Sequence, residues 1–110
     1  MSTKFDVGDL LAFDGTDWAE ADNTAEATLM VGMVSAVDEP TPGTYDVKIT
    51  TMGFVPLPAH GYTLGATYYL GVAGAVTTVP PSITGTFRQA VFKVLQDDKV
   101  LVLHQAAVQN

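Results

Sequence analysis

Residues 61–81 read GYTLGATYYLGVAGAVTTVPP and carry the plainest structural signal in the chain. Thr67–Leu70 is a short apolar and aromatic strand, and glycines space a reversal over residues 71–75. Val76–Val79 returns as a β-branched strand that two prolines end. Because Tyr, Val and Thr favour strands while Gly and Pro favour turns, this segment predicts a β-hairpin.

Similar signals recur on both sides of that hairpin. Strands are expected at 10–13, 18–21, 29–37, 45–50, 87–95 and 100–105, with Asp14-Gly15-Thr16 and residues 96–99 as hairpin turns. The strand at 29–37 is apolar enough to be covered on both faces, and its Gly32 predicts a bulge or a close backbone approach. Residues 21–28 are expected to be a loop, 38–43 an exposed turn without ladder pairing, and 51–58 an edge segment limited by its prolines.

Turn signals come about every ten residues, and no segment carries a convincing helical period. This spacing predicts an all-β fold, a small antiparallel β-sandwich or barrel built from hairpins. The length of 110 residues suits a single domain, 1–110. Its ends, 1–6 and 105–110, are expected to be flexible or docked at an interface.

The charge balance limits the partners. Five Lys and Arg residues stand against twelve Asp and Glu residues, a net charge of −7. An acidic chain without a basic stripe is repelled by phosphate, so neither nucleic acid nor an anionic membrane is an expected partner. The chain has no cysteine, and the first residues lack the apolar run of a signal peptide, which fits synthesis in the cytoplasm.

The sequence shows no catalytic or metal-binding pattern. His60 and His104 have no metal-ligand spacing and are expected to be structural or solvated. Residues 14–17 lack the spacing of a calcium loop, and Asp97-Asp98 is better explained as a hairpin tip than as an acid–base pair. No serine stands in a G-x-S-x-G elbow. We therefore expect no enzyme, no catalytic or metal residue and no cofactor.

Apolar and aromatic residues remain as candidates for function. Tyr68 and Tyr69 are adjacent in one strand, so their side chains point to opposite faces, and one of the two needs a second sheet, a neighbouring subunit or a ligand as its cover. The apolar runs 29–37 and 100–103 also need a cover on their second face. Either a closed oligomer or a sandwich with both faces internal would provide it. The two strands expected to serve either the core or a subunit interface supply the candidate interface residues, Tyr68, Tyr69, Leu70, Leu101 and Leu103. Alternatively, Trp18 and Tyr62 form a platform on which a sugar stacks.

Several segments together resemble a pattern found in tailed-bacteriophage virion proteins. The segments are YTLGATYYLG (62–71), GAVTTVPP (74–81), QAVFKVL (89–95) and LVL (101–103). The early segments VGDLLAFDG (7–15) and VGMV (31–34) also resemble small phage head-decoration proteins and β-domains of phage fibres. The likeness spans roughly residues 7 to 104. Where that pattern usually has a second glycine in the late strand, this chain has Phe92 and Lys93.

The resemblance implies a structural protein without catalytic residues. Its most direct form is a capsid decoration or stabilising protein on the virion surface, made in the host cytoplasm, that attaches to a capsid or fibre protein and self-associates as a homotrimer. The alternative is a carbohydrate- or receptor-binding module of a tail fibre, with Trp18 and Tyr62 as ligand contacts. Mutation of Trp18 separates the two, because only the second depends on that ring for binding.

Overall fold

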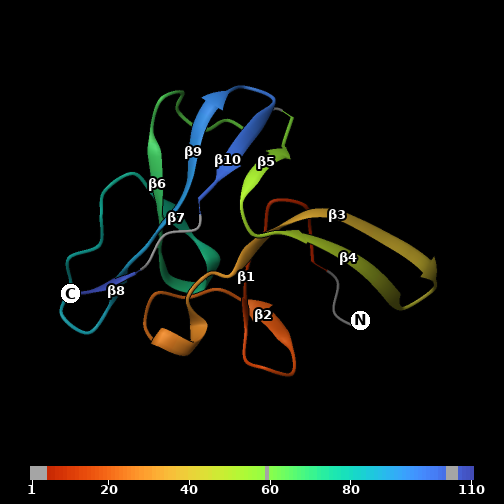
Figure 1. Ribbon diagram of the computed structural model, residues 1–110, viewed down its shortest axis with the longest axis horizontal. Helices are drawn as coiled ribbons and strands as arrows, with labels where there is room; N and C mark the ends of the chain where they lie inside the picture. The colour runs from red at the N-terminus through yellow and green to blue at the C-terminus, as the bar shows by residue number, and fades with distance from the viewer. Residues whose placement is uncertain (1–4, 59, 104–106) are drawn as a thin grey trace.

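A computed structural model describes residues 5–58, 60–103 and 107–110. Its strands form three antiparallel sheets, with the orders β2-β1-β3-β4, β5-β10-β9-β6-β7 and β11-β8 (Figure 1). The described residues contain no α-helix and no closed barrel. The predicted all-β antiparallel fold is therefore confirmed, as packed open sheets. No helix in the described part of the chain is long and apolar enough to cross a membrane.

The four-stranded sheet is built from the first half of the chain. Its strands are β1 (Leu10–Phe13), β2 (Trp18–Glu20), β3 (Gly32–Thr41) and β4 (Thr44–Thr50), with the short 3₁₀ helix η1 (Glu26–Thr28) between β2 and β3. The predicted hairpin at Asp14-Gly15 is confirmed: Phe13 pairs with Trp18, and the Asp14 carboxylate accepts the backbone N–H groups of Thr16 and Asp17, each at 2.8 Å. These bonds close the turn.

The second half of the chain builds the other two sheets. The five-stranded sheet contains β5 (Gly53–Pro56), β6 (Thr67–Leu70), β7 (Val76–Thr77), β9 (Ala90–Gln96) and β10 (Lys99–Val102), and η2 (Val72–Gly74) lies in the β6–β7 reversal. β8 (Phe87–Arg88) pairs with β11 (Val108–Gln109), so the last strand docks on its own chain. β5 lies at the sheet edge, as its prolines predict.

The main core lies between the two larger sheets. It combines Leu10 and Met33 of the four-stranded sheet with Val55, Phe92 and other residues of the five-stranded sheet. On the opposite face of the four-stranded sheet, Leu11 and Val34 pack against Phe5 in a second, smaller cluster. β1 and β3 are therefore covered on both faces, which confirms the expectation for the apolar segment 29–37.

Gly32 marks a close backbone approach, as predicted. A Cβ atom at this position would lie 2.5 Å from the Ile49 Cγ2 atom and 2.9 Å from the Thr50 carbonyl oxygen. Both distances are shorter than van der Waals contact, so only glycine lets β3 lie this close to β4.

The prediction of an unpaired turn over residues 38–43 was wrong. β3 continues to Thr41, pairing Asp38 with Asp46 and Thr41 with Thr44, and only Pro42 and Gly43 form the turn. Pro40 is accommodated because the register shifts between Asp38 and Thr41, where no ladder donor is required. The expected strand ends at residue 37 because Pro40 is expected to exclude pairing, whereas β3 continues to Thr41.

Two other strands are shorter than expected. β7 stops at Thr77, whose hydroxyl accepts the Val79 N–H at 3.1 Å and bends the chain away from the sheet. The strand expected over 87–95 is divided at Gln89 into β8 and β9. The Gln89 side chain is buried; it accepts the Met30 N–H and donates to the Met30 carbonyl, both at 2.8 Å. At this break, the Gln89 amide therefore makes the two backbone hydrogen bonds that a neighbouring strand would otherwise make to Met30.

Beyond the body of the four-stranded sheet, β3 and β4 continue as a two-stranded ribbon. This arm, residues 38–46, projects along the long axis of the molecule, at the right of Figure 1. Every residue in it is exposed except the half-buried Tyr45. Val37 and Val47, which flank the arm in the sequence, are the last residues of the ribbon that pack on the second cluster.

Candidate functional site

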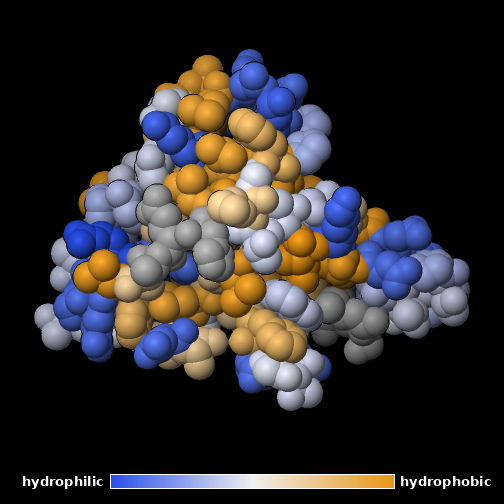
Figure 2. Space-filling model, in the orientation of Figure 1, coloured by the Kyte–Doolittle hydropathy of each residue, from blue (hydrophilic) through white to orange (hydrophobic). Residues whose placement is uncertain are grey.

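In the part of the chain that the structure describes, no other sheet completely covers the outer face of the five-stranded sheet. Alternation along the strands sends Val55, Val100 and Val102 into the core and their neighbours outward. Phe54 and Leu101 pair across β5 and β10 on this outer face, and Phe54 is 51% exposed. Leu95 is 49% exposed. Figure 2 shows apolar side chains reaching the surface over this part of the molecule.

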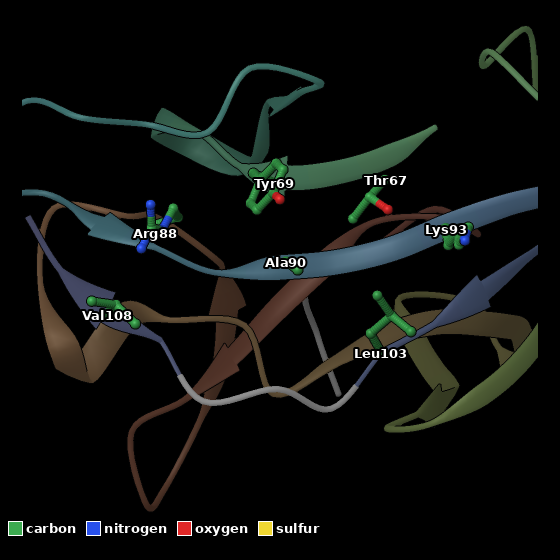
Figure 3. Close-up of a pocket in the computed structure, with 7 residues that line it drawn as sticks. All are labelled: Thr67, Tyr69, Arg88, Ala90, Lys93, Leu103 and Val108. Carbon is green, nitrogen blue, oxygen red and sulfur yellow. The ribbon is translucent and has the colours of Figure 1, made fainter. Parts of the chain in front are cut away.

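A groove of about 480 Å³ lies on the same sheet. It is lined by Thr67, Tyr69, Arg88, Ala90, Lys93, Leu103 and Val108. Ala90 forms its floor on the central strand, while Tyr69 from β6 and Leu103 after β10 stand on either side (Figure 3). The small side chain of Ala90, between two larger ones, creates the depression.

Positive charge is concentrated in this groove. Arg88 lies toward one end and Lys93 toward the other (Figure 3), and both side chains are exposed. They are two of only five cationic residues in a chain with a net charge of −7. Within the described residues, neither forms an ion pair shorter than 4.0 Å with a carboxylate. The groove therefore offers two cations and an apolar centre to an acidic group from outside.

A bulge explains why Arg88 and Lys93 share one face. Residues five apart on a regular strand point to opposite sides of a sheet. Here Tyr68 pairs with Phe92 but Tyr69 pairs with Ala90, so Val91 is an extra residue between them. Val91 and Phe92 are both buried, which returns Lys93 to the same side as Ala90.

The five predicted interface residues divide between the core and the surface. Tyr68 and Leu70 are buried in the main core of their own chain, which is the first of the two roles, core or subunit interface, expected for this strand. Tyr69 and Leu103 line the groove, and Leu101 lies half-buried on the outer face. Of the two adjacent tyrosines, Tyr69 is therefore the one whose side chain needs a further cover.

The two predicted ligand contacts do not form one platform. Trp18 stacks beside Phe13, with ring centroids 4.8 Å apart, and packs on the smaller cluster. Tyr62 packs on the main core between His60 and Tyr68. Burial raises the pKa of Tyr62, and the Tyr68 hydroxyl adds to the effect. Each ring is held by its own cluster rather than directed at a shared ligand.

A second, shallower pocket of about 260 Å³ borders Tyr62. His60 lines it, but both of its ring nitrogens are engaged with the backbone: Nδ1 accepts the Tyr62 N–H at 2.9 Å, and Nε2 lies 2.8 Å from the Gln96 carbonyl oxygen. This arrangement supports the structural role expected of His60. His104 lies outside the described residues, and those described contain no cluster of three or more potential metal ligands.

The groove was not among the predicted sites. Tyr69 and Leu103 were selected for their apolar character, but Arg88, Lys93 and Ala90 gave no signal because their shared face depends on the break at Gln89 and the bulge at Val91. The one feature of the sequence that could have indicated the groove is the low number of cationic residues, two of which line it. No family model matches this chain, and neither a curated protein nor a solved structure matches it.

Proposed function

We propose that this protein is a non-enzymatic structural protein of a tailed-bacteriophage particle. Its function is to decorate and stabilise a capsid by attaching to the shell and associating with further copies of itself. One observation carries the proposal: the outer face of the five-stranded sheet presents Phe54, Leu95 and Leu101 beside a groove lined by Tyr69 and Leu103. Contiguous apolar surface of this kind is typical of a docking face.

The segment resemblance supports the same function, since it includes β6, β7 and β9 of this sheet. Mechanistically, the protein would act by burying its outer face against the shell and against neighbouring copies. A specific interface of this type buries on the order of 1,200–2,000 Å² in total. The acidic surface would keep the protein soluble before assembly.

Labelling of assembled particles tests this function. Particles are produced from the genome that encodes the chain, and gold-labelled antibodies against the protein are located by electron microscopy. The proposal predicts regular label on the capsid and its loss from particles made after deletion of the gene. Particles without label, or label confined to host debris, would contradict it.

A receptor- or carbohydrate-binding role on a fibre is the second candidate. One observation favours it: the Phe13 and Trp18 rings lie together at the ends of the β1–β2 hairpin, and Phe13 is 41% exposed. Partly exposed aromatic pairs are suitable for sugar stacking. Gold label on fibre tips, together with glycan binding that Trp18→Ala abolishes, would replace the capsid proposal with this one.

A further inference from the structure

The arm of residues 38–46 has no covered face among the described residues, since every residue in it but the half-buried Tyr45 is exposed. A two-stranded ribbon without a covered face is marginally stable in water. The arm projects from one end of the molecule, whereas the groove lies on the part of the five-stranded sheet at the other side (Figure 1). The arm therefore cannot fold back into the groove of its own chain.

The arm carries an acidic pair that forms no ion pair with any cation in the described part of the chain. Asp38 and Asp46 are directly opposite each other in the β3–β4 ladder, and like charges in this position repel. Lys48 lies on the same strand face as Asp46, yet no ion pair shorter than 4.0 Å joins them among the described residues. The third acidic residue of the arm, Glu39, instead closes the turn, because its carboxylate accepts the Gly43 N–H at 3.0 Å.

The groove has the complementary charge, and the distance between its two cations leaves room for a strand of the arm. Arg88 and Lys93 are five positions apart, which corresponds to at most about 16 Å at 3.3 Å per residue, because the break at Gln89 and the bulge at Val91 shorten the span. The arm from Asp38 to Thr41 extends for about 10 Å on the same basis. Tyr69 and Leu103 offer apolar walls to the prolines of the arm, Pro40 and Pro42.

We propose that the arm of one copy docks into the groove of a second copy, with the adjacent Asp38 and Asp46 carboxylates placed between the Arg88 and Lys93 side chains. The proposal deepens the proposed function, on which it rests, by naming the surfaces through which the protein self-associates. Because arm and groove are different surfaces, the contact is head-to-tail, and such contacts generate a closed ring when the rotation between copies closes. This assembly leaves Phe54 and Leu95 available for the shell.

Charge variants measured by light scattering behind a sizing column test the docking. Arg88→Glu with Lys93→Glu reverses the groove, and Asp38→Asn with Asp46→Asn neutralises the arm. Each pair should weaken self-association at least tenfold, the equivalent of about 1.4 kcal/mol. Asp97→Asn with Asp98→Asn is the matched control for the arm variant, because it also neutralises two acidic side chains but lies at the β9–β10 turn, outside the arm and the groove, and it should leave the mass unchanged.

Two further readouts separate docking from a folding defect. The neutral arm variant removes a repulsive pair, so its melting temperature in the monomeric state should stay equal to that of the wild type or rise, while its association weakens. A chain that combines Asp38→Lys and Asp46→Lys with the reversed groove should regain the wild-type mass. High salt should dissociate the wild-type oligomer, since exposed ion pairs are screened.

The results separate this inference from the function on which it rests. An oligomer that none of the arm or groove variants weakens would overturn arm docking, and so would a wild-type protein that stays monomeric at all concentrations. Neither result removes gold label from the capsid. Conversely, unlabelled particles with charge-dependent oligomers would contradict the virion role and retain the docking.

Discussion

Replacement of Gln89 tests the contact that divides the long strand and shapes the groove. Its buried amide satisfies both the N–H and the C=O of Met30, 59 residues away in the sequence, at 2.8 Å each. Gln89→Ala would leave two buried backbone groups without a partner, at about 1–3 kcal/mol each. The expected loss in the free energy of unfolding is therefore about 2–6 kcal/mol, a large part of the 5–15 kcal/mol typical of a domain.

The assay is urea unfolding followed by circular dichroism at one fixed protein concentration, because association would otherwise change the apparent stability. Gln96→Ala is the matched control: it removes the same side chain at the end of β9, where it is exposed, so its effect should stay within about 0.5 kcal/mol. A loss below 1 kcal/mol for Gln89→Ala, or equal losses for the two variants, would refute the reasoning.

A charge variant adds a pH test of the same contact. In Gln89→Glu, a protonated carboxyl can still accept the Met30 N–H and donate to the Met30 carbonyl, whereas the ionised form cannot donate. Burial raises the folded-state pKa of the introduced carboxyl above its unfolded value of about 4.3. Stability relative to the wild type should therefore be highest below pH 4 and fall as the pH rises to 7. A deficit that grows on acidification would contradict the geometry.

Two further predictions concern the four-stranded sheet and its connections. Gly32→Ala places a Cβ atom 2.5 Å from Ile49, and the forced shift between β3 and β4 should cost about 1–3 kcal/mol in urea unfolding; an unchanged midpoint would show that the strands separate freely. Hydrogen bonds from the Thr24 side chain and from nearby backbone N–H groups lower the pKa of Asp22 below its ordinary 3.8, so its contribution is present above that pH and is lost as the pH falls through the lower folded value. Asp22→Asn should therefore show a smaller drop in melting temperature than the wild type between pH 6 and pH 2.5, and an equal drop would contradict this.

Much of the fold could be predicted because its signals are local. Asp14-Gly15 fixed the first hairpin, and the alternation of Tyr45, Val47 and Ile49 identified a half-buried strand. The residues around Gly71 gave the central hairpin for the same reason. Each of these features depends on the pleat or on turn chemistry within a few residues.

The remaining features depend on contacts between distant residues. The division of the strand at Gln89 requires Met30, and the length of the arm requires a register shift that accommodates Pro40. The separation of Trp18 from Tyr62 results from sheet packing, which period and composition do not report. The groove also depends on such contacts, because its cations share a face only through the break at Gln89 and the bulge at Val91.

The mass of the wild-type protein in solution tests self-association most directly. Light scattering behind a sizing column is performed near physiological salt over a hundredfold range of concentration. The account predicts a closed oligomer, expected to be a trimer with three times the 11.6 kDa mass of one chain, that persists on dilution and dissociates in high salt. A particle of 11.6 kDa at every concentration would contradict it, because both the groove and the arm would then lack the partner proposed for them.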